Sequence, residues 1–358
     1  MTGQLITVVG AGGIGGNLAG GLALAGERVQ VVEVGAHLEA IRERGLRLEG
    51  SRGEHVVHFE SIVSPSGLRG PLPLVLLATR GHQTAEALAA VAPHLADDGL
   101  VVSTQNGLSA RVIAARIGER RTIPCMVHVV GALESPGVVG RYTEGELRLG
   151  EYDGTVSDRV RALAARLSPA VPAQASGNVW GFIWCKLIHV AQNLATGVVD
   201  ATAAEVREPE WVRRILVAVE LEVVDLATAL GVTLEAYERI DPAVLVTLHD
   251  EAGLRRALDM LPRASEKGHN GTWRELKRGG KTETSATTEE LARLGRERGL
   301  PMTLMSELHQ IVDGIERRER DMSWDNLRAL RERAERGLAA RVARGAPGPV
   351  SKTTGSFS

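Results

Sequence analysis

The sequence predicts an α/β protein with two parts: an N-terminal domain built on a parallel sheet (residues 1–175) and an all-helical C-terminal domain (residues 176–340). In the first part, short apolar runs alternate with helical patterns, which is the βαβ rhythm that builds a parallel sheet. Beyond about residue 176 no convincing strand alternation occurs, and long amphipathic segments replace it. The last residues, 341–358, are rich in Gly, Pro, Ser and Thr and are expected to form a disordered tail.

The N-terminal domain is expected to contain five strands and three helices. The strands are Leu5–Val9, Val29–Val34, Leu72–Ala78, Leu100–Thr104 and Pro124–Val130. The helices are Asn17–Ala25, Thr84–Ala92 and Ala110–Ile117. Gly137–Gly150 differs, because a Pro-Gly turn precedes an alternation of apolar residues. This pattern is typical of a small antiparallel addition to the sheet.

The C-terminal domain is expected to contain at least three long amphipathic helices. They are Trp211–Leu230, Thr288–Arg298 and Leu304–Arg317. Gly231 follows the first, and Gly299 and Pro301 follow the second, as helix stop signals do. All five tryptophans lie in this half of the chain, which favours a packed helical domain.

A glycine-rich turn directly follows the first strand and directly precedes the first helix. Its G-x-G-x-x-G pattern comprises Gly10, Ala11, Gly12, Gly13, Ile14 and Gly15. Between a strand and a helix, such a turn binds a dinucleotide: the first glycine permits the turn, the second admits the pyrophosphate and the third lets the helix pack closely. The helix N-terminus then faces the phosphates. We therefore predict a dinucleotide-binding domain of Rossmann type; a turn with a purely conformational purpose is the alternative.

The end of the second strand indicates which cofactor binds. Glu33 lies about 20 positions beyond the glycine turn, where an acidic residue accepts hydrogen bonds from the adenosine ribose. A carboxylate there repels the additional phosphate of NADP, and the next residue, Val34, supplies no guanidinium. The sequence therefore favours NADH over NADPH. Two alternatives stay open: Glu33 caps the strand in solvent, or Arg42 and Arg44 turn toward the cofactor.

Composition excludes several classes of partner. The formal net charge of −2 gives no basic excess for nucleic acid or an anionic membrane surface. The two cysteines, Cys125 and Cys185, do not form a disulfide framework or a zinc-ligand cluster, so no metal is expected. A strand begins within the first residues, which leaves no room for a signal peptide, and no apolar run approaches the roughly 18–20 residues that span a bilayer. We expect a cytoplasmic protein without a membrane segment.

Several further motifs occur in a family-specific order through most of residues 5–315. After the glycine turn they are Leu76–Thr84, Gln105-Asn106-Gly107-Leu108, Pro136–Val139, Leu147–Gly150, Trp184-Cys185-Lys186-Leu187, Lys281-Thr282-Glu283 and Gly299-Leu300-Pro301. On these motifs the chain resembles the ketopantoate reductase (2-dehydropantoate 2-reductase) family. The resemblance implies a nicotinamide-dependent reductase of pantothenate biosynthesis. It also implies that a 2-keto acid is reduced at a cleft between a Rossmann domain and a helical domain.

The resemblance also assigns roles to polar residues in these motifs. Lys186 is the proton donor to the carbonyl oxygen, and its apolar sequence neighbours suit a lysine whose pKa is lowered by burial. Glu283 binds substrate and orients the lysine, and Asn106 hydrogen-bonds cofactor or substrate. Arg80 replaces the usual lysine after the third strand and keeps a positive charge near the cofactor or the substrate carboxylate. The ordinary alternatives are a lysine that reaches the surface, a solvated glutamate and an Asn-Gly turn.

The sequence departs from the family at residues that contact the substrate. Val190 and Leu194 stand where the family carries asparagines, with His189, Gln192 and Asn193 close by. Gly271-Thr272 replaces a Ser-Met pair, and Thr284–Thr288 replaces the usual residues after Glu283. Loss of hydrogen-bonding groups weakens discrimination for a substrate hydroxyl.

The sequence therefore favours an oxidoreductase that transfers a hydride from a reduced nicotinamide cofactor to a small 2-keto acid, ketopantoate or a relative. Two alternatives stay open: a related dehydrogenase that acts on another oxo or hydroxy acid, and a non-enzymatic NAD(H)-binding module. The exposed faces of the C-terminal helices leave a homodimer and a solvated monomer both open.

Overall fold

The apolar runs of the N-terminal half form one eight-stranded sheet of order β12-β11-β8-β7-β6-β1-β2-β5 in the computed structural model, which describes residues 3–261, 268–279 and 281–345. Six neighbouring strands of this sheet are parallel to one another, namely β8, β7, β6, β1, β2 and β5. Strand β11 runs antiparallel to β8, and β12 runs parallel to β11. The strands are β1 (Ile6–Val9), β2 (Val29–Val32), β5 (Ser61–Val63), β6 (Leu72–Leu77), β7 (Leu95–Ser103), β8 (Thr122–His128), β11 (Glu146–Leu149) and β12 (Ala173–Ala175). The five predicted strands are all present.

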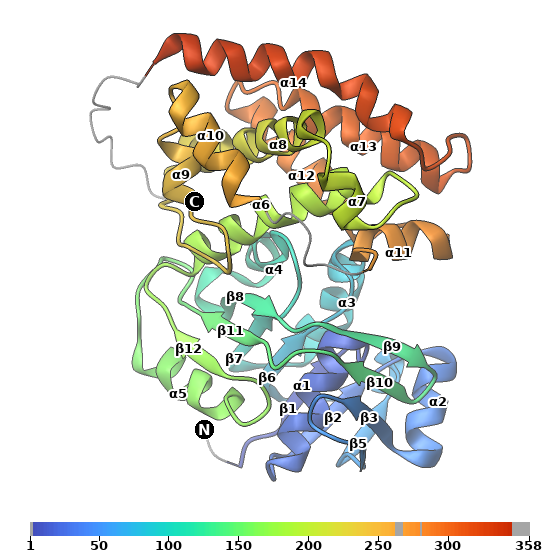
Figure 1. Ribbon diagram of the computed structural model, residues 1–358. Helices are drawn as coiled ribbons and strands as arrows, with labels where there is room; N and C mark the ends of the chain where they lie inside the picture. The colour runs from blue at the N-terminus through green and yellow to red at the C-terminus, as the bar shows by residue number, and fades with distance from the viewer. Residues whose placement is uncertain (1–2, 262–267, 280, 346–358) are drawn as a thin grey trace. The chain divides into compact units, whose positions relative to one another are not determined.

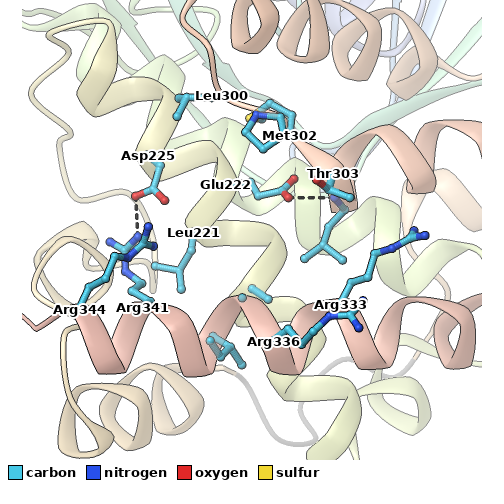
Figure 2. Close-up of a pocket in the computed structure, with 15 residues that line it drawn as sticks. Leu221, Glu222, Asp225, Leu300, Met302, Thr303, Arg333, Arg336, Arg341 and Arg344 are labelled. Atoms are coloured by element: carbon cyan, nitrogen blue, oxygen red, sulfur yellow. Dashed lines mark hydrogen bonds and ion pairs between the residues drawn. The ribbon is translucent and has the colours of Figure 1, made fainter.

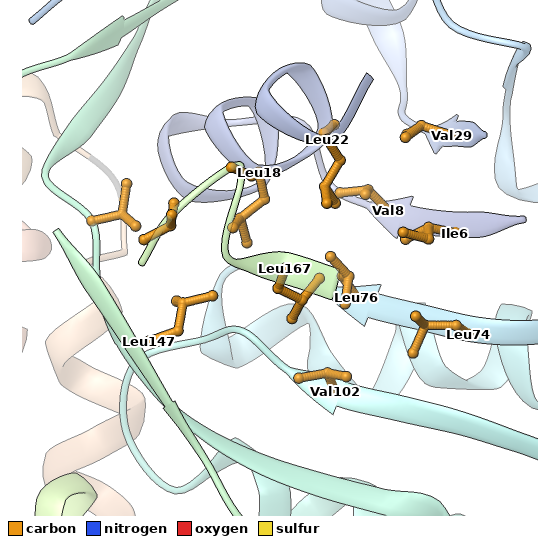
Figure 3. Packing of buried hydrophobic residues seen from close by; sticks show 14 of the residues in the cluster. Ile6, Val8, Leu18, Leu22, Val29, Leu74, Leu76, Val102, Leu147 and Leu167 are labelled. Atoms are coloured by element: carbon orange, nitrogen blue, oxygen red, sulfur yellow. The ribbon is translucent and has the colours of Figure 1, made fainter. Parts of the chain in front are cut away.

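Helices cover both faces of this sheet, which explains why its strands are apolar runs rather than alternations. Leu18 and Leu22 of α1 (Gly13–Leu24) pack over Val8 and Leu76 (Figure 3), and α5 (Asp158–Leu167) adds Leu167 to the same cluster. On the other face, Leu88 of α3 (Thr84–Val91) and Ile113 of α4 (Ser109–Ile117) pack against residues such as Val75 and Leu77. Residues next to each other in a strand therefore belong to opposite cores.

A second, four-stranded sheet of order β4-β3-β10-β9 was not predicted (Figure 1). Its strands are β3 (Leu46–Gly50), β4 (His55–Val57), β9 (Gly131–Ser135) and β10 (Val138–Arg141). The expected antiparallel addition is correct for β11, but β10 pairs with β9 and β3 instead. Alternation reports that a strand is half-buried and carries no information about its partner.

Several element boundaries differ from the expected ones. Helix α1 starts at Gly13, inside the glycine turn, and not at Asn17. Glycine has a low helix propensity, so the local sequence did not predict a helical turn there. Strand β2 ends at Val32, since Val34 is already the N-cap of α2 (Gly35–Arg44). Strand β7 begins at Leu95, before the apolar run that marks its buried part.

The chain divides into two compact units between Trp180 and Gly181, shortly after the boundary expected at residue 175. In the second unit, the regular elements among the described residues are helices. They are α6 (Val179–Gly197), α7 (Ala203–Arg207), α8 (Glu210–Ala229), α9 (Pro242–Val246), α10 (Glu251–Met260), α11 (Gly271–Arg278), α12 (Glu283–Glu297), α13 (Thr303–Glu316) and α14 (Trp324–Arg344). The sequence-based fold class, a parallel-sheet domain followed by a helical domain, is confirmed.

The C-terminal boundary needs a correction. Residues 341–344, which we assigned to the disordered tail, complete α14. Arg341 donates to Asp225 of α8 at 2.6 Å and to the Leu248 carbonyl oxygen at 3.0 Å. These contacts with distant residues hold the last turn of α14. The amino-acid composition of the tail, on which the prediction of disorder rested, gives no information about such contacts. Residues 346–358 lie outside the described part of the chain.

No helix within the described ranges is long and apolar enough to cross a membrane. Likewise, the described residues contain no group of three or more His, Cys, Asp or Glu side chains placed to hold a metal ion. Cys125 and Cys185 are both buried thiols.

Candidate functional site

The glycine turn uses its three motif glycines for different physical reasons. Gly10 has a φ of +87°, which L side chains rarely adopt, and a Cβ there would lie 3.0 Å from the Thr79 nitrogen. A Cβ on Gly15 would lie 1.8 Å from the Gly10 carbonyl oxygen and 2.8 Å from Ala78 Cβ. A Cβ on Gly12 would meet no atom within 4 Å. Two glycines are thus required by close packing of the protein itself, while Gly12 faces open space.

The N-terminus of α1 lies at this open space. Gly12 is its N-cap, no side chain caps the helix, and its first turn carries no acidic residue. The first N–H groups of a helix have no partner within the helix and attract anions. Ala11 is buried, Ile14 is half-buried against the core, and Gly13 packs where a Cβ would lie 2.3 Å from the Gly131 carbonyl oxygen. This arrangement fits the pyrophosphate of a dinucleotide.

Glu33 lies beside the turn and is held by two backbone N–H groups. Its Oε2 accepts from Ala11 at 2.6 Å and its Oε1 accepts from Val34 at 2.9 Å. The carboxylate is therefore fixed against the glycine turn rather than extended into solvent. Arg42 is turned elsewhere, since it pairs with Glu39 and donates to the Ile62 carbonyl oxygen at 3.2 Å.

Arg80 and Asn106 follow β6 and β7, the next strands along the sheet from β2 and β1. Because parallel strands end at the same edge, the glycine turn, Glu33, Arg80 and Asn106 share the carboxyl edge of the sheet, where ligands bind in open α/β folds. Arg80 is exposed and Asn106 is half-buried. Gln105 joins the two loops, since its Nε2 donates to the Thr79 carbonyl oxygen at 2.8 Å and to Thr84 Oγ1 at 2.9 Å.

Lys186 lies on α6, among half-buried residues that share one stripe of that helix. The stripe comprises Phe182, Lys186, His189, Val190 and Asn193. At 100° per residue these positions project within about one quadrant on either side of Lys186. The sequence neighbours Trp184, Cys185 and Leu187 are buried instead and anchor the helix.

The stripe explains part of the departure from the family pattern. Leu194 is fully buried and belongs to the helical core, whereas Asn193 lies on the same stripe as Lys186. Gln192 is also buried, and its amide donates to Glu220. The polar residues near Lys186 on this helix are therefore His189 and Asn193, with Val190 between them.

Glu283 is the first residue of α12 and is half-buried. Two carboxylates hold the backbone at the start of this helix: the Thr282 N–H donates to Glu316 at 2.7 Å and the Glu283 N–H donates to Glu275 at 3.1 Å.

The predicted site residues form two sets, one in each unit. The turn residues, Glu33, Arg80 and Asn106 belong to the first unit, and Lys186 and Glu283 belong to the second.

A hollow of about 440 Å³ lies in the helical unit between α8, α14 and the segment Leu300–Leu304 (Figure 2). Its charges are largely paired within the protein: Arg341 with Asp225, Arg333 with Glu307 and Arg336 with Glu332. Glu222 accepts from the Leu304 and Met305 N–H groups at 2.8 and 2.9 Å and so caps α13. Burial raises the pKa of this carboxyl group. The hollow contains none of the predicted site residues.

Sequence reasoning missed two residues that organise the first set. One is Gln105, described above. The other is His37, whose buried ring bonds the backbone of the glycine turn. A histidine in the first turn of the helix after Glu33 was the available signal, but its partners are distant in sequence.

Comparisons with known proteins agree on one family. The family model for ketopantoate reductase PanE/ApbA matches residues 6–154, and the model for the C-terminal part of the same family matches residues 178–316. A 2-dehydropantoate 2-reductase from Mesorhizobium japonicum is 32% identical over 252 residues, which are 63% of this chain and 77% of that protein.

Solved structures show the same similarity. A PanE/ApbA family ketopantoate reductase from Ralstonia eutropha superimposes with a TM-score of 0.74 at 29% identity, over 88% of this chain and 99% of that one. A D-mandelate dehydrogenase with NADH and anilino(oxo)acetate superimposes with a TM-score of 0.75 at 18% identity, over 88% and 99% of the two chains. At that identity the second likeness shows the fold alone.

Proposed function

This chain belongs to the ketopantoate reductase family, and from that premise we propose that it transfers a hydride from a reduced nicotinamide cofactor to a small 2-keto acid. Membership makes the chain an oxidoreductase that uses a nicotinamide cofactor. The observation that carries the proposal is the glycine turn, whose Gly12 faces open space at a helix N-terminus without a side-chain cap.

The bound cofactor supplies the hydride, and the chain's own residues supply the proton and the positioning. Negative charge develops on the carbonyl oxygen during reduction, so a cation that donates a proton stabilises the transition state. In the proposal Lys186 is this donor, and its half-buried place on α6 leaves its side chain accessible to a ligand. Glu283 binds substrate and orients Lys186. Asn106 hydrogen-bonds cofactor or substrate, and Arg80 attracts the substrate carboxylate or the cofactor.

We propose that NADH is preferred over NADPH, although the family usually takes NADPH. The argument rests on Glu33, which two backbone N–H groups hold beside the glycine turn. A carboxylate fixed there accepts hydrogen bonds from a ribose diol and repels a phosphate on the same ribose. Arg42 and Arg44, the two arginines considered for neutralising that phosphate, are paired with Glu39 and Glu43 instead.

A second candidate substrate is a 2-keto acid with an apolar side chain. It is favoured by Phe182 and Val190, which flank Lys186 on the half-buried stripe of α6. An apolar surface beside the proton donor suits a hydrocarbon or aryl group better than the hydroxyl of ketopantoate.

One experiment tests both substrates. The purified protein is mixed with NADH or NADPH, and loss of absorbance at the nicotinamide band is followed with ketopantoate and with phenylglyoxylate. Faster turnover of ketopantoate supports the activity of the family, and faster turnover of phenylglyoxylate supports the apolar candidate. Cofactor binding without turnover of either acid, or of a wider panel of 2-keto acids, would contradict the proposed reaction.

A further inference from the structure

The backbone of Ala11, inside the glycine turn, is held from two sides by residues that follow β2. Its N–H donates to Glu33 Oε2 at 2.6 Å, and its carbonyl oxygen lies 2.9 Å from His37 Nε2. Ala11 is fully buried, so neither backbone group exchanges these partners for bulk water. A buried backbone group that loses its partner is costly, and both bonds therefore constrain the turn.

The second ring nitrogen of His37 is also bonded to backbone. The Gly137 N–H donates to Nδ1 at 2.9 Å, and His37 as a whole is 7% exposed. Because Gly137 donates, Nδ1 acts as the acceptor, and the proton of the neutral ring belongs on Nε2, which donates to Ala11. This tautomer, assigned from the two backbone partners, satisfies both hydrogen bonds at once.

His37 thereby connects the glycine turn to the second sheet. Gly137 forms the turn between β9 and β10, with a φ of +83°. Two further contacts join the same hairpin to α1: Gly13 packs against Gly131, and Asn17 Nδ2 donates to the carbonyl oxygens of Gly13 at 2.7 Å and Gly140 at 3.1 Å. The hairpin therefore supports the start of α1 at three places.

We propose that His37 is a positioning residue of the dinucleotide site. Its ring holds the Ala11 carbonyl oxygen on one side and the Gly137 N–H on the other. The ring thereby connects the glycine turn, residues Gly10–Gly12, with the β9–β10 hairpin. The N–H groups at the start of α1 are then already oriented when the phosphates arrive, which lowers the ordering cost of binding. This inference rests on the proposed function, because it presumes that the turn binds a dinucleotide.

A merely structural role predicts a different result. If His37 only holds α2 on the sheet, its replacement lowers the melting temperature and leaves cofactor affinity unchanged. A positioning role requires that the affinity for NADH falls in a protein that is still folded. It also requires faster amide exchange at Gly137 and within the turn.

The test uses three substitutions of His37 in the full-length protein. His37→Leu removes both hydrogen bonds, His37→Asn keeps an acceptor near the Nδ1 position, and His37→Gln keeps a donor near the Nε2 position. The dissociation constant of NADH is measured by fluorescence titration, and amide exchange is measured by mass spectrometry on the peptides that contain Ala11 and Gly137. His309→Leu is the matched control, because His309 bonds Thr288 in the helical unit, at 2.9 Å.

We expect His37→Leu to raise the NADH dissociation constant about tenfold, because the unsupported turn must then be ordered when the cofactor binds; a tenfold change corresponds to about 1.4 kcal/mol. His37→Gln should retain most of the affinity and lose protection at Gly137, and His37→Asn should show the reverse. Wild-type affinity in a folded His37→Leu, or in both amide variants if Leu does not fold, would overturn the inference. Failure of the wild-type protein to bind NADH or NADPH would instead overturn the proposed function.

Discussion

The chemistry proposed for each unit rests on single side chains. In the first unit, Glu33 binds the glycine turn through Ala11 and also lies where a ribose is expected. In the second unit, Lys186 lies on a half-buried stripe of α6 between Phe182 and Val190. A polar group beside apolar neighbours at a half-buried position is accessible to a ligand and partly shielded from water, which strengthens its electrostatic effect on a bound substrate.

Lys186→Ala should lower kcat by a factor on the order of 10² to 10⁴, because general acid catalysis typically contributes that much. The dissociation constant of NADH should change little, since the role proposed for the lysine concerns the substrate oxygen and not the cofactor. Steady-state kinetics and cofactor titration measure both. Lys277→Ala is the control, because Lys277 forms a surface ion pair with Asp200 at 2.8 Å. Activity of Lys186→Ala within a few-fold of wild type would remove the lysine from the proton-donor role.

Glu33→Gln should narrow the preference for NADH over NADPH. Glutamine keeps an oxygen that can accept from the Ala11 N–H but removes the charge that repels a ribose phosphate. Glu33→Ala also removes the hydrogen bond and should weaken the binding of both cofactors. The ratio of the two dissociation constants is the measurement. An unchanged ratio in Glu33→Gln would exclude this carboxylate from cofactor discrimination.

Secondary-structure elements place these side chains. Strands β2, β1, β6 and β7 are neighbours, so the loops after them meet at one edge of the sheet. Helix α1 begins inside the glycine turn and packs closely on β1 because Gly15 has no side chain. The sequence predicted the strand, the glycine turn and the helix in this order, because the glycine spacing and the adjacent apolar run lie within a short stretch of chain.

Two alanine substitutions distinguish Gly15, which close packing requires, from Gly12, which is proposed to face the cofactor. Gly15→Ala places a Cβ 1.8 Å from the Gly10 carbonyl oxygen and should destabilise the fold by about 1–3 kcal/mol, the cost of overpacking. Gly12→Ala meets no atom within 4 Å and has an ordinary φ of −72°, so stability should be retained. It should nevertheless weaken NADH binding, because the methyl group occupies the space proposed for the phosphates. Urea unfolding and NADH titration test the pair; unchanged NADH binding by Gly12→Ala would contradict this placement.

At the scale of the whole molecule, the two units divide the work proposed for the enzyme. The family models match residues 6–154 and 178–316, and α14 lies beyond the second of these ranges.

In the helical unit, Glu220 of α8 is fully buried, and this burial raises the pKa of its carboxyl group to about 8. A hydrogen bond from Gln192 and the charge of Arg207 lower the pKa, but the effect of burial is larger. This carboxyl group links the stability of the fold to pH.

The sign of this effect follows from proton binding. The raised pKa means that between about pH 4.5 and pH 8 the folded chain keeps a proton that the unfolded chain releases. Stability from this group is therefore fully present below pH 4.5 and decreases as pH rises, by up to about 1.4 kcal/mol per pH unit. Glu220→Gln removes the titration, so its stability relative to wild type should increase from pH 5 to pH 8. Urea unfolding at several pH values measures this difference, with the exposed Glu332→Gln as control; a constant difference would contradict a buried neutral Glu220.

By itself the sequence determined the features that depend on neighbours along the chain. Local apolar patterns and glycine spacing predict the five parallel strands, the glycine turn, the place of Glu33 directly after β2, and the long helices α8, α12 and α13. The family resemblance added four candidate site residues, Lys186, Glu283, Asn106 and Arg80, whose roles stay predictions.

Tertiary structure decided what depends on distant partners. The second sheet pairs β3 with β10, and His37 bonds Gly137, which lies 100 residues further along the chain. Likewise, the last turn of α14 is held by Arg341, whose partner Asp225 lies 116 residues earlier. A local pattern shows that a residue is buried or half-buried, but the hydrogen-bonding partner exists only once the chain has folded, and that partner gives His37 its place beside the glycine turn.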